Sequence, residues 1–281
     1  MSAATTRVRL DELLVQRGHA ASREKARALV LAGRVAIGGV GPAKPGRLVS
    51  ADAALEVRPA AEYVSRGGLK LAHALARFQV EPRGRVCADI GASTGGFTDC
   101  LLQRGAARVY AIDVGYGQLA WSLRTDPRVI VMDRTNARSI EALPDAVTLT
   151  TVDVSFISLR TILPAIARIA ARESEIVALV KPQFEAGKAR VGKGGVVRDP
   201  SIHHEVLSGL SGWFLGAGYL LLGLVPSPLR GAAGNVEFLA HLRQGEITRA
   251  DDPGPGRLVQ VALDEAQELF PAGVRRTGER R

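Results

Sequence analysis

The stretch VCADIGASTGGFTD, residues 86–99, decides the fold. Its apolar start predicts a strand over Val86–Ile90, followed by a glycine-rich turn over Gly91–Gly96 and a helix from Phe97 onward. Glycines at such a turn let a ligand approach the backbone at the carboxyl edge of an open α/β sheet. The turn lacks the G-x-G-x-x-G spacing that places a pyrophosphate on a helix N-terminus, so a dinucleotide is not favoured.

Two acidic residues restrict the class of ligand that we expect at this turn. Asp89, just before it, would repel a phosphate but suits a cationic, amine-bearing ligand. Asp113 ends the next predicted strand, where a carboxylate accepts hydrogen bonds from ribose hydroxyls. S-adenosylmethionine carries both a cationic methionine end and a ribose, and we expect it to be the cofactor. The alternatives are a turn that only solves a packing problem and an Asp113 that only caps a helix.

Strands and helices alternate around the turn. Helical patterns lie between most of the strands, and Asp199 with Pro200 opens one of them as N-cap and N1 residues. The alternation predicts an α/β fold with a seven-stranded, mostly parallel sheet and helices on both faces. This Rossmann-like arrangement, with its last two strands close in sequence, suits a class I methyltransferase. The predicted strands lie near residues 85–90, 108–113, 128–132, 147–153, 175–181, 219–226 and 236–242.

Composition and charge restrict the partners. The chain has 281 residues, a net charge of +9 and a pI near 10.1, and such an excess of cations favours polyanions such as nucleic acid. A device for solubility is the alternative. No apolar run reaches the length of a membrane span and the N-terminus lacks a signal-peptide pattern, so we expect a cytoplasmic protein without a membrane partner. With only Cys87 and Cys100, we expect no metal site or disulfide framework, and both thiols are predicted to be core residues.

Residues 1–58 form a small α+β domain in this interpretation. Its first two segments, RLDELLVQRG (9–18) and SREKARALVLAG (22–33), are helical in spacing, with Ser22 as an N-cap, and two short strands follow. The first 60 residues hold ten Lys or Arg against five Asp or Glu. The Leu-rich first helix, the Ser-Arg-x-x-Ala second helix and the Gly-x-Val-x-Ile-x-Gly turn resemble the S4 RNA-binding domain. The resemblance implies RNA contacts, against the alternative of a solvated basic face, at Arg9, Arg17, Arg23, Lys25, Arg27 and Arg34.

Four charged residues are candidates for catalysis: Lys70, Asp153, Lys181 and Glu237. Asp153 and Lys181 end successive predicted strands at the edge that holds the glycine turn. Deprotonation of an alcohol fits this set, because a lysine becomes a base once a neighbouring ammonium and burial lower its pKa, and Lys70 is the candidate neighbour of Lys181. The carboxylates would hold both amines in place. Two structural salt bridges at a sheet edge are the alternative.

A second resemblance covers residues 8–243. It rests on SRGGLKL (65–71), ADIGASTGGFTD (88–99), AIDVGYGQL (111–119), DRTNAR (133–138), DVSFISL (153–159), LVKPQFEAG (179–187), GKGGVVRD (192–199) and GNVEFL (234–239). Together these motifs resemble the TlyA family, also called haemolysin A, whose catalytic domain is FtsJ-like. The resemblance implies S-adenosylmethionine-dependent 2′-O-methylation of cytidine in ribosomal RNA, with ribosomal subunits as partners. It also implies a Lys-Asp-Lys-Glu tetrad, which falls on the four residues above.

The same resemblance assigns binding residues. Asp113 would hold the cofactor ribose, and Asp133 with Arg134 would flank the adenine, although an Asp133 that caps a helix is the alternative. Ser155 and Phe156 are candidates for placing the target nucleotide, a core position being the alternative for Phe156. The cofactor turn would be lined by Gly91, Ala92, Ser93, Thr94, Gly95, Gly96 and Phe97. The loop of residues 181–199, with five glycine or proline breaks, would contact RNA, unless it is merely solvated, through Lys188, Arg190, Lys193 and Arg198.

The chain is thus divided into an S4-like domain at 1–58, a linker at 59–64, a methyltransferase domain at 65–245 and a C-terminal tail at 246–281. Within the tail, DEAQELF (264–270) is expected to form one or two helical turns, and RRTGERR at its end to be disordered. Three rival functions are a non-catalytic RNA-binding protein, a membrane-lytic protein and a pseudouridine synthase. The last uses no cofactor and would leave the glycine turn without a role.

Overall fold

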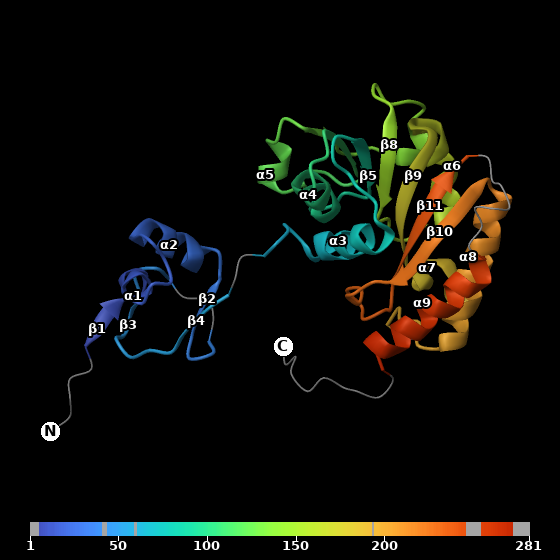
Figure 1. Cartoon of the computed structure of the whole chain (residues 1–281). Helices are drawn as coiled ribbons and strands as arrows, with labels where there is room; N and C mark the ends of the chain where they lie inside the picture. The colour runs from blue at the N-terminus through green and yellow to red at the C-terminus, as the bar shows by residue number, and fades with distance from the viewer. Residues whose placement is uncertain (1–5, 41–43, 59–60, 193, 246–253, 272–281) are drawn as a thin grey trace. The chain divides into compact units, whose positions relative to one another are not determined.

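The computed structural model describes residues 6–40, 44–58, 61–192, 194–245 and 254–271. These residues divide into two compact units, Met1–Ala61 and Glu62–Arg281 (Figure 1). Each unit has its own buried hydrophobic cluster. The division falls inside the segment predicted as the linker.

The N-terminal unit packs two helices against two pairs of short strands. α1 (Leu10–Gln16) and α2 (Arg23–Leu31) bury Leu10, Leu14 and Val30 in one core. The Oγ of Ser22 accepts a hydrogen bond from Lys25 N at 3.2 Å, which confirms the predicted N-cap. The two predicted short strands are β2 (Val35–Ile37) and β4 (Leu55–Val57), and they pair antiparallel. β1 (Arg7–Arg9) and β3 (Leu48–Ser50) also pair. Each of these strands has only three residues, too few to show the alternation of apolar and polar side chains that predicts a strand.

A seven-stranded sheet organises the second unit, with the order β10-β11-β9-β8-β5-β6-β7. β11 is antiparallel to both of its neighbours, whereas β7, β6, β5, β8 and β9 run parallel. The predicted mostly parallel seven-stranded sheet is therefore confirmed. The strands are β5 (Val86–Ile90), β6 (Arg108–Ile112), β7 (Val129–Met132), β8 (Val147–Val152), β9 (Ala170–Val180), β10 (Tyr219–Pro226) and β11 (Phe238–Gln244).

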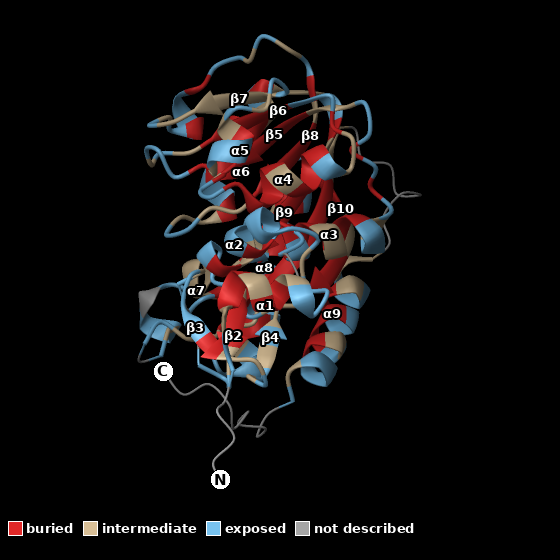
Figure 2. Cartoon of the chain, turned by 90° about the vertical axis from the view of Figure 1, so that its left-hand side faces the viewer, coloured by how far each residue is buried: buried red, intermediate tan, exposed pale blue. Residues whose placement is uncertain are grey.

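Helices cover both faces of this sheet. α3 (Arg66–Phe78), α4 (Gly96–Gln103) and α5 (Trp121–Arg124) pack on one face, and α6 (Leu159–Ile169), α8 (Pro200–Gly216) and α9 (Pro255–Leu269) on the other. Side chains alternate along each strand, so Cys87 joins the core of the first face and Ala88 and Ile90 join that of the second. Figure 2 shows the resulting buried strands between half-exposed helices. Cys87 and Cys100 are buried free thiols, as predicted.

The parallel strands bring their carboxyl ends to one edge of the sheet. β5, β6, β8 and β9 end at Ile90, Ile112, Val152 and Val180. The next residue in each case belongs to the glycine turn or is one of the charged candidates Asp113, Asp153 and Lys181. The topology therefore collects at this edge residues that are far apart in the sequence.

The structure differs from the predicted boundaries at both ends of the catalytic unit. Tyr63, inside the predicted linker, is 7% exposed and packs under Gly68, where a Cβ would lie 2.2 Å from the Tyr63 ring. The predicted one or two turns of DEAQELF belong to α9, a helix of 15 residues. α9 buries Val259, Ala262 and Ala266 in the same core as α8 and β10. Its described part is thus a structural element of this unit rather than a tail, whereas RRTGERR lies outside the described residues.

Candidate active site

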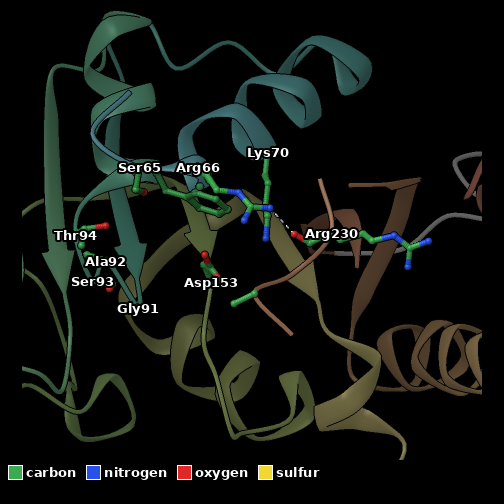
Figure 3. Close-up of a pocket in the computed structure, with 13 residues that line it drawn as sticks. Ser65, Arg66, Lys70, Gly91, Ala92, Ser93, Thr94, Asp153 and Arg230 are labelled. Atoms are coloured by element: carbon green, nitrogen blue, oxygen red, sulfur yellow. Dashed lines mark hydrogen bonds between the residues drawn. The ribbon is translucent and has the colours of Figure 1, made fainter. Parts of the chain in front are cut away.

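A cavity of about 480 Å³ opens at the carboxyl edge of the sheet, between the turn after β5 and the start of α3 (Figure 3). Lys70 and Asp153 both line it. Six residues of the predicted cofactor turn line it too: Gly91, Ala92, Ser93, Thr94, Gly96 and Phe97. Its walls also hold residues that the sequence did not single out: Ser65, Arg66, Gly67, Arg230 and Ala232.

The glycines of the turn are required by close backbone contacts. Gly91 has a φ of +85°, and a Cβ there would lie 2.5 Å from the carbonyl oxygen of Asp153. A Cβ on Gly96 would lie 2.2 Å from the Oγ of Ser65 and 2.9 Å from the amide nitrogen of Gly68. The bare backbone therefore lets the turn lie directly against β8 and α3, which shapes the cavity.

Asp113 holds the outer part of the turn. Its Oδ2 accepts a hydrogen bond from Ser93 N at 2.8 Å, and its Oδ1 accepts one from Gly115 N at 2.7 Å. Ser93 itself has a φ of +48°, so the Asp113 carboxylate stabilises a backbone conformation that is uncommon for serine. Asp113 is half-buried at the end of β6 and does not line the cavity itself.

Asp89 is placed differently from the prediction. It is fully buried, and its two oxygens accept hydrogen bonds from Thr98 Oγ1 at 2.7 Å and Thr151 Oγ1 at 3.1 Å. Asp89 shares the face of β5 that carries Cys87, which turns it toward α4 rather than into the cavity. Burial, together with the nearby Asp153, raises the pKa of Asp89 to about 7, although the hydrogen bonds from Thr98 and Thr151 act in the opposite direction. The structure therefore gives Asp89 no direct contact with a ligand in the cavity.

This shift predicts a pH effect on folding. Between the ordinary pKa of 3.8 and about 7, unfolded Asp89 is ionised while the folded residue keeps its proton, so its contribution to stability falls as pH rises through this window. We expect Asp89→Asn, which does not titrate, to lose less free energy of unfolding between about pH 4 and about pH 7 than the wild type. Urea unfolding at several pH values measures this, and equal slopes for both proteins would contradict it.

Asp133 and Arg134 do not line the cavity. Asp133 Oδ2 accepts a hydrogen bond from Arg124 Nη2 at 2.7 Å and one from Gly117 N at 3.1 Å. The Arg124 hydrogen bond lowers the pKa of Asp133 below its ordinary value. The guanidinium of Arg134 lies 4.2 Å above the ring of Tyr116, a side chain that is 67% exposed. Asp133 thus fixes the loop after β6, and no sequence pattern indicated this role of Arg124.

The four candidates for catalysis form two ion pairs. Lys70 Nζ donates to Glu237 Oε2, and these residues are 8% and 3% exposed. Lys181 Nζ lies 2.6 Å from Asp153 Oδ1 and donates to Ser155 Oγ at 2.9 Å. Lys70 and Asp153 line the same cavity, so each pair contributes one residue to its wall. The chain approaches the first pair so closely at Gly231 that a Cβ would lie 2.3 Å from Glu237 Oε1.

Phe156 lies beside this cluster and is 90% exposed, so the alternative of a core position is wrong. Its φ is +64°, an uncommon value for a residue with a side chain, and its ring lies 4.9 Å from that of Phe184. An exposed ring held by a strained backbone next to Ser155 is available to a planar ligand.

The predicted RNA contacts fall into two groups. In the N-terminal unit, Arg9 and Arg23 form ion pairs with Asp11, whose pKa the Arg9 hydrogen bond lowers. Arg17 donates to the carbonyls of residues 51 and 53, and Arg34 donates to that of residue 58. Lys25 and Arg27 are exposed, and the structure records no hydrogen bond or ion pair of their side chains with the described residues.

The second group lies in the loop of residues 181–199. Arg190, in the short helix η2 (Lys188–Arg190), forms an ion pair with Glu205 of α8, and Arg198 is exposed. Lys193 and the side chain of Lys188 lie outside the described residues. No helix of the described chain is long and apolar enough to cross a membrane. The described residues also hold no group of three or more His, Cys, Asp or Glu side chains able to bind a metal ion.

The fold and the site define a methyltransferase with an RNA-binding domain at its N-terminus. Residues 63–244 match the FtsJ-like methyltransferase model, and residues 8–54 match the S4 domain model. The FtsJ-like model alone covers more than half of the chain. The pseudouridine synthase alternative is therefore wrong.

Individual relatives specify the family. The chain is 51% identical to the 16S/23S rRNA (cytidine-2′-O)-methyltransferase TlyA of Mycobacterium tuberculosis, over 84% of this chain and 90% of that protein. It is 41% identical to Hemolysin A of Brachyspira hyodysenteriae, over 83% of this chain and 99% of that protein. A solved structure from Streptococcus thermophilus has a TM-score of 0.72 and 41% identity, covering 95% of this chain and 98% of that one. The chain belongs to the TlyA family.

Proposed function

We propose that this protein transfers a methyl group from S-adenosylmethionine to the ribose 2′-hydroxyl of a cytidine in ribosomal RNA. The observation that carries the proposal is that each of two lysine–carboxylate pairs contributes one residue, Lys70 or Asp153, to a cavity walled by the glycine turn. The cytidine and the ribosomal RNA come from the name of the Mycobacterium tuberculosis relative. Ribosomal RNA as substrate places the proposed activity in the cytoplasm.

The turn fits a nucleoside cofactor. A Cβ on Gly91 or Gly96 would collide with backbone, so the wall of the cavity there is peptide, which offers a ligand only amide and carbonyl groups at close range. We assign Gly91–Phe97 to the cofactor, Asp113 to its ribose, and Asp133 and Arg134 to the region of its adenine. S-adenosylmethionine supplies an electrophilic methyl group when bound. Asp89 supports the turn indirectly, by accepting hydrogen bonds from Thr98 and Thr151, rather than by direct contact with the cofactor.

We assign the proton transfer to Lys181. Asp153 and Ser155 fix its Nζ at the end of β9, and Asp153 itself reaches the cavity. The amine takes the 2′-hydroxyl proton as the oxygen is methylated, and it does so only in its unprotonated form. Lys70, held by Glu237, lines the opposite side and positions the ribose through its ammonium.

Phe156 is assigned to the target nucleotide. Reaching a 2′-hydroxyl in folded RNA requires the base to leave its stack, which costs a few kcal/mol. An exposed ring beside the proposed base Lys181 offers a new stacking surface for that nucleotide.

The proposal is tested by incubating the full-length protein with S-adenosylmethionine and ribosomal subunits, followed by mapping of ribose methylation. We expect a new 2′-O-methylcytidine. Transfer to a base, or binding of RNA with no transfer at all, would contradict the proposal.

RNA binding by the N-terminal unit gives a separate prediction. We expect the double variant Lys25→Ala with Arg27→Ala to weaken RNA binding and to lower the slope of log K against log salt by about two, since each lost phosphate contact removes about one. The ion-paired Arg23 is a poorer choice, because its loss also removes the ion pairs with Asp11 and Glu12. Binding titrations at several salt concentrations measure the slope. The control is Arg257→Ala on α9, and an unchanged slope in the double variant would overturn the assignment.

A further inference from the structure

A second cavity, of about 730 Å³, adjoins the first. It lies between the start of α8, the end of α9, the loop before α8 and the loop that joins β10 to β11. Arg230 lines both cavities, so this residue forms part of the wall between them. In Figure 1, α8 and α9 lie side by side on the same face of the sheet. The four catalytic candidates do not line this second cavity.

The walls of this cavity are fixed by hydrogen bonds. Asn235, 1% exposed, accepts from Val197 N at 2.8 Å through Oδ1 and donates to the carbonyl of Gly195 at 2.8 Å through Nδ2. Arg230 Nη1 donates to the carbonyl of Gly234 at 3.0 Å, and its guanidinium lies 4.6 Å above the ring of Phe270. The two loops and the end of α9 are therefore held together by their own contacts.

One residue that lines the cavity has a buried polar atom without a partner among the described residues. His203, 8% exposed, lines the cavity, and its Nε2 has no hydrogen-bond partner among the described residues. Burial lowers the pKa of His203, with Asp199 acting in the opposite direction and Arg230 in the same one. A neutral imidazole nitrogen offers one hydrogen bond to a ligand. An unsatisfied buried polar group is costly, and a ligand that pairs with it relieves that cost.

The remaining lining combines cations with apolar surface. Arg198 and Arg230 supply guanidinium groups that match a phosphate. Val197, Val236, Leu263 and Phe270 supply apolar and aromatic contacts for a flat ring. An anion joined to a planar ring with a polar edge is the chemistry of a nucleotide.

We propose that the second cavity is a subsite for a nucleotide of the RNA strand adjacent to the methylated one. The proposal rests on the proposed function. If the methylated nucleotide lies at Lys181, the RNA strand passes Arg230, which lines both cavities, and the adjacent nucleotide reaches the second cavity. The base of that neighbour occupies the apolar part, its edge pairs with His203 Nε2, and its phosphate lies between Arg198 and Arg230. The net charge of +9 favours an RNA strand over a neutral ligand.

The test uses variants at the mouth of the cavity. Gln267 lines it from α9 and is exposed, so Gln267→Trp fills the space without touching the core. Gln260→Trp is the matched control, because Gln260 is an exposed glutamine of the same helix that does not line either cavity. Arg198→Ala is paired with Arg257→Ala in the same way. We expect Gln267→Trp and Arg198→Ala to raise the KM for RNA about tenfold, with kcat, the Kd for S-adenosylmethionine and Tm unchanged.

A second measurement identifies the occupant. An RNA substrate that is abasic next to the methylated position should raise the KM of the wild type but leave that of Gln267→Trp unchanged, because the variant has already lost the contact. Equal penalties in both proteins would overturn the proposal, as would variants that match their controls. Tight binding of cytidine monophosphate in the absence of RNA, abolished by Gln267→Trp, would make the ligand a free nucleotide and also overturn it. If the wild type methylates no RNA, the proposed function fails before the subsite is reached.

Discussion

Lys181→Ala is expected to lower the rate of methyl transfer to ribosomal RNA by about 10²–10⁴-fold, the range that a general base contributes. The variant removes the amine that Asp153 and Ser155 hold at the cavity. It leaves the glycine turn and the N-terminal unit unchanged, so the Kd values for S-adenosylmethionine and RNA should change by less than about threefold. Single-turnover rates with saturating RNA, together with calorimetric titration of the cofactor, measure the two effects separately.

The variant Lys181→Arg tests whether Lys181 acts as a base or only as a positive charge. Arginine keeps the positive charge beside Asp153, but it does not give up its proton at accessible pH. A base at position 181 therefore makes Lys181→Arg as slow as Lys181→Ala. A Lys181→Arg variant that retains the wild-type rate would reduce Lys181 to a structural partner of Asp153. Full loss of RNA binding in Lys181→Ala would instead make it an RNA contact.

The sheet and its functional edge follow from local patterns in the sequence. Apolar runs of strand length alternate with helical spacing from Val86 to Gln244, and parallel strands then end at one edge. Asp153 and Lys181 had to lie near the glycine turn for this reason alone. Lys70 and Glu237 are different, because they lie on α3 and before β11, and only packing brings them together.

Three features show where local patterns are insufficient. Asp89 was expected at the ligand because it lies at a strand end, but strand alternation assigns it to the face of Cys87, and Thr98 and Thr151 complete its burial. Phe156 is exposed and its backbone adopts a positive φ, and neither property is indicated by its sequence neighbours. Arg230 lies in a loop between two strands, and only the folded chain places it at both cavities.

The full length of the C-terminal helix α9 is also not predicted by local sequence patterns. Val259, Ala262 and Ala266 lie at helical spacing, yet only one or two helical turns were expected from the sequence, in DEAQELF (264–270). The stability of α9 comes from burial of these residues against α8 and β10, a contact that no local rule predicts.

Glu237→Ala is expected to destabilise the catalytic unit by about 3 kcal/mol, because it leaves the Lys70 ammonium buried without its partner. Lys70 is 8% exposed and reaches the cavity, which moves the cost toward the lower end of the range for buried pairs. A loss of this size corresponds to a Tm lower by about 6–12 °C in a domain of this length. Thermal unfolding followed by circular dichroism measures it.

The double variant Lys70→Met with Glu237→Leu tests whether the Lys70–Glu237 pair has a structural or a catalytic role. Removing both charges eliminates the unpaired ammonium, so we expect most of the lost stability to return. A double variant as unstable as Glu237→Ala would mean that lost packing near Gly231, and not the charge, causes the effect. Methyl transfer then decides between the two interpretations of the pair. If the pair is only a structural salt bridge, the double variant should methylate RNA at the wild-type rate. If the Lys70 ammonium positions the ribose, the double variant should fold and bind the cofactor normally but no longer methylate RNA.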